Sequence, residues 1–103
     1  MRGFTILRAA AYTAAGGGSN YARNCTITYI GAGIYDYTLS HALPHDEMMA
    51  DFVLGTTDCT GFLVSSSDTV KRFTTREADP TAAAAAKDCA HYISFWRTAW
   101  GLT

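Results

Sequence analysis

The sequence contains few charged residues and no excess of either sign. Among 103 residues there are eight Lys or Arg and nine Asp or Glu, which amounts to 17% charged residues and a formal net charge of −1. Binding to nucleic-acid phosphates needs a concentrated basic surface. The only local basic cluster is Lys71, Arg72 and Arg76, and on a strand only Arg72 and Arg76 share a face. The sequence therefore predicts that nucleic acid is not a partner.

Long apolar runs are also absent. A membrane-spanning helix needs about 18 consecutive apolar residues, and no segment of the chain approaches that length. Near the N-terminus the apolar run Phe4–Leu7 ends at Arg8, which makes it too short for the hydrophobic region of a secretory signal. The sequence therefore predicts neither a membrane partner nor a signal peptide.

Cysteine is scarce and odd in number. Cys25, Cys59 and Cys89 contain no C-x-x-C pair, so they indicate neither a disulfide framework nor a structural zinc site. We expect free, buried thiols, as in proteins made in a reducing compartment. One disulfide between two of the three stays an open alternative, because spacing alone does not decide the pairing.

The remaining composition is that of one small globular domain. Apolar residues make up 49% of the chain and aromatic residues 13%, which excludes intrinsic disorder. A domain of this length buries only about 60 to 68% of its unfolded surface, so its own core is modest. The aromatic content is more than such a core needs, and we expect part of it to lie at an interface.

Strand signals recur along most of the sequence. Residues 23–40 alternate polar with β-branched or aromatic residues on both sides of Gly31-Ala32-Gly33, which predicts a β-hairpin. Further strand signals follow at 48–54, 61–64, 69–77 and 89–100. Short strands at such spacing, separated by polar turns, are typical of a small antiparallel sandwich or barrel. The sequence therefore predicts an all-β domain over residues 23–103.

Two segments depart from this pattern. Residues 1–22 contain Phe4–Thr13 and then three consecutive glycines, so we interpret them as an N-terminal arm or edge strand followed by a glycine-rich loop. Asp79, Pro80 and five alanines predict at most one short helix near 80–87, with a loop as the alternative.

The last strand signal is apolar on both faces. His91, Ile93 and Phe95 lie on one side, and Tyr92, Trp96 and Trp100 lie on the other. Such a strand is either central in a covered sheet or meets another subunit.

Two groups of residues are candidates for chemistry. His41, His45, Asp46 and Glu47 are all potential metal ligands, but Ala42 and Pro44 rule out the helical spacing of zincins. Cys89 and His91 would share a strand face about 6.6 Å apart, too far for the hydrogen bond that activates a thiol. We therefore predict no metal site, no cofactor and no catalytic residues, and we expect the protein not to be an enzyme.

Three segments carry a resemblance to a known group of proteins. They are the glycine hairpin Tyr29–Leu39, the turn and strand start Ser66–Val70, and the aromatic strand Tyr92–Phe95. In this order they resemble small β-sandwich structural proteins of tailed bacteriophages, namely capsid decoration (cement) proteins and related tail-fibre modules. The similarity covers roughly residues 23–98.

The resemblance implies a jelly-roll-like or immunoglobulin-like sandwich that trimerises and clamps neighbouring capsid subunits. The expected function is that of a virion structural protein which binds the outer capsid surface and stabilises the shell. Its partners would be the major capsid protein and further copies of itself, and its location the capsid surface after synthesis in the host cytoplasm. The alternative is a tail-fibre or carbohydrate-binding module. We expect the capsid or subunit contacts at Phe4, Ile6, Leu7, Tyr92, Trp96 and Trp100.

Overall fold

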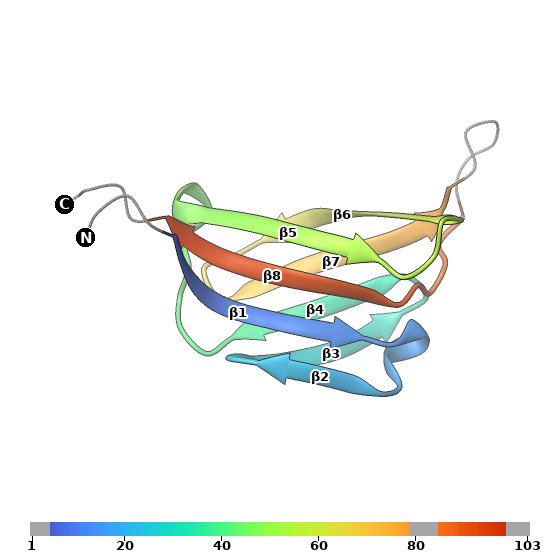
Figure 1. Cartoon of the computed structure of the whole chain (residues 1–103), viewed down its shortest axis with the longest axis horizontal. Coiled ribbons are helices and arrows are strands. Elements are labelled where there is room, and N and C mark those ends of the chain that lie inside the picture. Colours follow the sequence, from blue (N-terminus) through green and yellow to red (C-terminus); the bar gives the residue numbers. More distant parts are fainter. Residues whose placement is uncertain (1–4, 79–84, 99–103) are drawn as a thin grey trace.

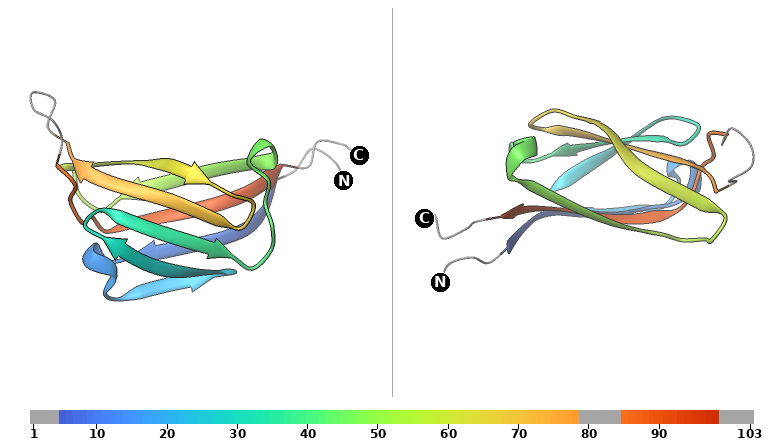
Figure 2. Two further views of the ribbon diagram at one scale, coloured as in Figure 1. Left: turned by 180° about the vertical axis from the view of Figure 1, so that it is seen from behind. Right: turned by 90° about the horizontal axis from the view of Figure 1, so that it is seen from above.

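A computed structural model of the chain describes residues 5–78 and 85–98. Within them the chain forms two four-stranded antiparallel sheets that pack face to face (Figures 1 and 2). The first sheet has the order β2 (Asn20–Arg23), β1 (Thr5–Thr13), β8 (His91–Thr98), β5 (Met48–Leu54). The second has the order β3 (Cys25–Gly31), β4 (Ile34–Leu39), β7 (Val70–Glu77), β6 (Cys59–Ser66). This confirms the predicted all-β antiparallel sandwich.

The core lies between the sheets and follows the period-two alternation of the strands. On β8, His91, Ile93 and Phe95 face inward and are at most 2% exposed, while Tyr92 faces outward. The predicted division of this strand into two faces is confirmed. The largest buried side chains of the second sheet are Tyr35, Tyr37 and Phe73.

The first strand corrects the interpretation of residues 1–22. β1 is neither an arm nor an edge strand, because it pairs with β2 on one side and with β8 on the other. Ala9, Ala11 and Thr13 are buried and form part of the core surface of the first sheet. The run of alanines hides the alternation in the sequence, since Ala is compatible with either face of a sheet. The glycine-rich segment after β1 contains the short 3-10 turn η1 (Ala15–Gly17) and leads into β2.

The predicted hairpin is present as β3 and β4, and Gly33 is its critical residue. Its φ is +70°, in the left-handed region that favours glycine. Its N–H donates to Asp88 Oδ1 (2.7 Å), and its carbonyl accepts from the Thr75 N–H (2.8 Å). A Cβ at this position would lie 2.3 Å from the Thr75 carbonyl oxygen. The turn therefore fits closely against β7 and the segment that precedes β8.

The helix predicted near 80–87 falls mainly outside the described residues. The part that is described, 85–87, is not helical. It runs beside the end of β7, where Ala86 forms a bridge to Arg76 and the Glu77 N–H donates to the Ala85 carbonyl (3.0 Å). Elsewhere, the described helical segments are the 3-10 turns η1 and η2 (His45–Glu47), and neither has the length or apolar character needed to cross a membrane.

Candidate functional site

A row of large side chains crosses the outer face of the first sheet. The strand registers pair Tyr21 with Tyr12, Tyr12 with Tyr92, and Tyr92 with Val53. One residue from each of the four strands therefore stands in a single line on the solvent side. The rings of Tyr12 and Tyr92 contact each other, with centroids 4.7 Å apart. We call this outer surface the tyrosine face.

A second row on the same outer surface lies two residues further along each strand and is polar rather than aromatic. It consists of Arg23, Ala10, Ser94 and Asp51, in the order β2, β1, β8, β5. The two central residues are small, and the two at the sheet edges carry opposite charges. Together the rows border an open groove of about 230 Å³, lined by residues that include Tyr12, Tyr21, Asp51, Val53, Tyr92 and Ser94.

The tyrosine face is uncovered. Tyr21 is 68% exposed, Val53 64% and Tyr92 60%. Within residues 5–78 and 85–98, the three tyrosine hydroxyls of the row make no hydrogen bond, and Arg23 and Asp51 form no ion pair. Exposed apolar groups gathered on one surface mark contact sites in soluble proteins. The arrangement can bind a flat partner surface or a ligand with apolar faces, with polar groups at its margins.

The six predicted contact residues do not all lie on the tyrosine face. Tyr92 lies on the tyrosine face, and Trp96 follows four positions later on the same outer side of β8, where its Nε1–H donates to Ser94 Oγ (2.8 Å). Ile6 and Leu7 lie in β1, paired with Arg97 and Trp96. Phe4 and Trp100 lie outside the described residues.

Of the eight residues in the two rows the sequence predicts only Tyr92, and the seven others, which include Tyr12, Tyr21, Arg23 and Asp51, were missed. A signal for Tyr12 and Tyr21 exists, because a hairpin centred on the glycine-rich segment 14–19 places these two residues opposite each other. The position of Asp51 depends on the pairing of β5 with β8, which are far apart in sequence.

A buried polar network lies beneath the tyrosine face. His91 Nδ1–H donates to the Cys89 carbonyl (2.8 Å), so Nε2 is the acceptor and receives the Tyr37 hydroxyl. Thr13 Oγ1 and Tyr37 OH are 2.6 Å apart. Thr13, Tyr37 and His91 are all 0% exposed, and burial is the main cause that lowers the pKa of His91 and raises that of Tyr37. The network joins β1 and β8 to β4 across the core.

The buried histidine predicts a loss of stability in mild acid. Because the pKa of His91 is lower in the folded protein than its ordinary value of 6.5, the unfolded chain takes up the proton first. The stabilising contribution is complete above pH 6.5 and falls as the pH decreases below that value. Urea unfolding between pH 8 and pH 5 checks this, with His41→Gln, at an exposed histidine, as a control that retains the effect. A free energy of unfolding that is constant over this range would contradict it.

The cysteines differ from the expectation of three free thiols. Cys59 and Cys89 form a disulfide, and Cys25 is a free, half-buried thiol whose pKa is raised by burial. The bond joins the start of β6 in the second sheet to the segment before β8 in the first. It also occupies the Cys89 sulfur, so the structure holds no free Cys89 thiol that could pair with His91 for nucleophilic chemistry.

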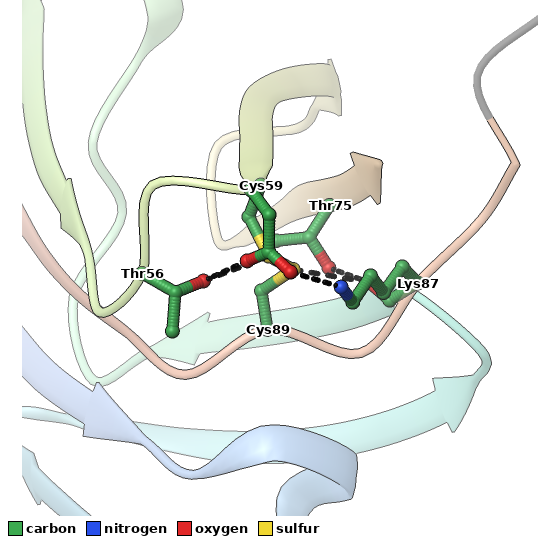
Figure 3. Close-up of polar contacts among 6 residues, drawn as sticks. Thr56, Cys59, Thr75, Lys87 and Cys89 are labelled. Carbon is green, nitrogen blue, oxygen red and sulfur yellow. Dashed lines mark hydrogen bonds and ion pairs between the residues drawn. A yellow bond between two sulfur atoms is a disulfide. The ribbon is translucent and has the colours of Figure 1, made fainter. Parts of the chain in front are cut away.

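Polar contacts surround the disulfide and fix the same segment (Figure 3). Thr75 Oγ1 donates to the Lys87 carbonyl (2.5 Å), and Lys87 Nζ donates to Asp58 Oδ2 (2.6 Å). The bond from Lys87 is the largest cause that lowers the pKa of Asp58 to about 2. On the other side, Asp88 accepts from the Tyr29 hydroxyl (2.8 Å) as well as from Gly33. These bonds order the segment that leads into β8, one of the two central strands of the tyrosine face.

The basic cluster is divided as the alternation predicts. Lys71 is buried, and its Nζ donates to the Leu43 carbonyl (2.6 Å) and to the Ser67 carbonyl. Arg72 forms a bidentate ion pair with Asp36 on the outer face of the second sheet (2.8 and 2.9 Å). Arg76 lies over the Phe62 ring, with its guanidinium carbon 5.0 Å from the ring centroid. The three cations therefore do not form a single basic surface.

The segment with two histidines lies at the other end of the sandwich. His41 and Ser40 share a hydrogen bond of 3.1 Å, and Glu47 pairs with Arg97 at 3.0 Å. Among the described residues, no group of three or more His, Cys, Asp or Glu side chains is placed to hold a metal ion.

Comparisons of the chain with protein-family models, with curated proteins and with solved structures found no match.

Proposed function

We propose that the chain is a structural protein of a tailed-phage virion, a capsid decoration protein that acts by adding contact area to the shell. The observation that carries the proposal is the uncovered tyrosine face. A domain of this size has no internal use for three tyrosines and a valine aligned on one outer surface, whereas an assembly contact buries them.

The rigidity of the domain is consistent with a mechanical role. The disulfide, the Asp88 contacts and the buried network hold the strands below the tyrosine face in fixed positions. A preorganised surface loses little conformational freedom when it binds. Copies that are joined to one another also bind a repeating lattice more tightly than a single copy does, through avidity. Many such contacts raise the barrier to opening of a shell under internal pressure.

Shell binding tests the proposal. The purified chain is mixed with undecorated shells assembled from the major capsid protein of the same phage, and pelleting and the melting temperature of the shells are measured. We expect saturable co-pelleting at a stoichiometry set by the lattice, together with a higher melting temperature. Absence of co-pelleting at all concentrations would contradict the proposal.

A second candidate function is a carbohydrate-binding module. It is favoured by the groove itself, because tyrosine rings offer stacking surfaces to sugar rings, and Asp51 and Ser94 offer hydrogen-bond groups beside them. Titration with a panel of oligosaccharides, followed by intrinsic fluorescence, tests it. A saturable change that is lost in Tyr92→Ser favours this function, and an unchanged signal across the panel removes it.

A further inference from the structure

We propose that two copies of the chain pair through their tyrosine faces about a two-fold axis that runs parallel to the strands, between β1 and β8. This deepens the proposed function, since it rests on the use of the same face as a contact surface and names its partner as a second copy. The distribution of residues across the four strands supports this pairing.

Under this symmetry each row of one copy faces the same row of the partner. Because the sheet order is β2-β1-β8-β5, the axis lies at the middle of the sheet and sets β1 opposite the partner's β8, and β2 opposite the partner's β5. Tyr12 then faces the partner's Tyr92, and Tyr21 faces the partner's Val53. Apolar and aromatic side chains meet along the whole row.

The second row, which we call the charged row because Arg23 and Asp51 stand at its ends, is also complementary to itself. Arg23 and Asp51 stand at opposite ends of one row, three strand spacings or about 14 Å apart. The symmetry places Arg23 opposite the partner's Asp51, and Asp51 opposite the partner's Arg23. An in-plane axis that runs across the strands along this row would instead set like charges against each other. The charges therefore select one of the two ways in which the faces can meet.

The centre of the charged row permits close approach. Ala10 and Ser94 are small, so the two backbones can reach the spacing of about 10 Å at which sheets pack in sandwiches. The uncovered groove is then filled by side chains of the second copy.

The area available for pairing on the tyrosine face is small. The strands β2, β1, β8 and β5 have 4, 9, 8 and 7 residues, and at about 3.3 Å by 4.8 Å for each residue they span about 450 Å² on each copy. Two such faces bury about 900 Å², which is just below the area of about 1,000 Å² expected of a stable specific interface. We expect a reversible pair that depends on concentration, which a lattice of binding sites would reinforce.

Charge reversal tests the pairing. Sedimentation velocity over a range of concentrations is measured for the wild type, for Asp51→Arg and for Arg23→Asp. Each single variant sets like charges together at both ends of the row, so we expect its dimer to be at least about tenfold weaker. In an equal mixture of the two variants every contact is again between opposite charges, and we expect association to return to the wild-type level or above it.

Controls separate the interface from net charge. Asp46→Arg and Arg76→Asp make the same charge changes away from the tyrosine face, and each alone and both mixed should associate as the wild type does. Circular dichroism confirms that each variant is folded.

Several results would overturn the pairing. They are a wild type that stays monomeric throughout, single variants that associate normally, and a mixture that fails to recover. A trimer whose association is unchanged by Asp51→Arg and by Arg23→Asp would also overturn it and would favour the trimer expected from the resemblance. Saturable oligosaccharide binding by a monomeric wild type would assign the groove to a sugar instead. Shell binding is measured separately, so the pairing and the decoration role can fail independently.

Discussion

Gly33→Ala is expected to destabilise the protein by about 4 kcal/mol or more, which is at the upper end for a single substitution. The residue has a φ of +70°, and the added Cβ would lie 2.3 Å from the Thr75 carbonyl oxygen. Backbone atoms of a central strand cannot move away at low cost, because β7 is paired on both sides. The turn would have to leave β7, and the bond from Gly33 to Asp88 would be lost with it.

Urea unfolding of Gly33→Ala beside Gly31→Ala measures this effect. Gly31 lies in the same hairpin, but a Cβ there meets no atom within 4 Å and its φ is not positive. We expect Gly31→Ala to change the free energy of unfolding by less than about 1 kcal/mol. Equal losses in the free energy of unfolding at the two positions would contradict the claim that the close approach of Gly33 to β7 causes the effect.

Removal of the disulfide is expected to lower the free energy of unfolding by about 3 kcal/mol, as for loops of similar length in other proteins. Cys59 and Cys89 are separated by 30 residues and connect the two sheets. A domain with total stability of about 5 to 15 kcal/mol would lose a large part of it. The tyrosine face would be affected as well, because Cys89 directly precedes the buried network at the start of β8.

Unfolding of Cys59→Ala/Cys89→Ala, and of the wild type with and without reductant, tests this prediction. Cys25→Ala is the matched control, since Cys25 is outside the disulfide and only half-buried. The control should keep its response to reductant, and the double variant should have none. A wild type whose stability does not respond to reductant would contradict the expected contribution of the bond.

The sequence predicts most strands because their patterns are local. The hairpin of β3 and β4 and the two faces of β8 follow from alternation and from the glycine turn alone. β1 was assigned wrongly because alanines carry no information about which side is buried. The disulfide could not be predicted, since Cys59 and Cys89 meet only when β6 and β8 are placed in opposite sheets.

The candidate site was predicted only in part, for a related reason. Tyr92 and Trp96 could be chosen because a strand that is apolar on both faces is unusual. Their neighbours on the tyrosine face come from three other strands, and a shift of one residue in any register would turn those side chains toward the core. Arg23 and Asp51 look like ordinary surface charges until the sheet order is known. A single strand pattern thus reveals one member of the face but not its composition.

Hydroxyl-radical footprinting of the tyrosines, in the dilute free chain and in the chain bound to shells, tests most directly whether the tyrosine face is a contact surface. We expect Tyr21 and Tyr92 to react readily in the dilute chain and to be protected in the assembly. Tyr29 is 40% exposed on the other sheet and provides an internal reference whose reactivity should change less. Tyr21 and Tyr92 that stay fully reactive in the shell-bound protein would contradict the claim that the tyrosine face is a contact surface.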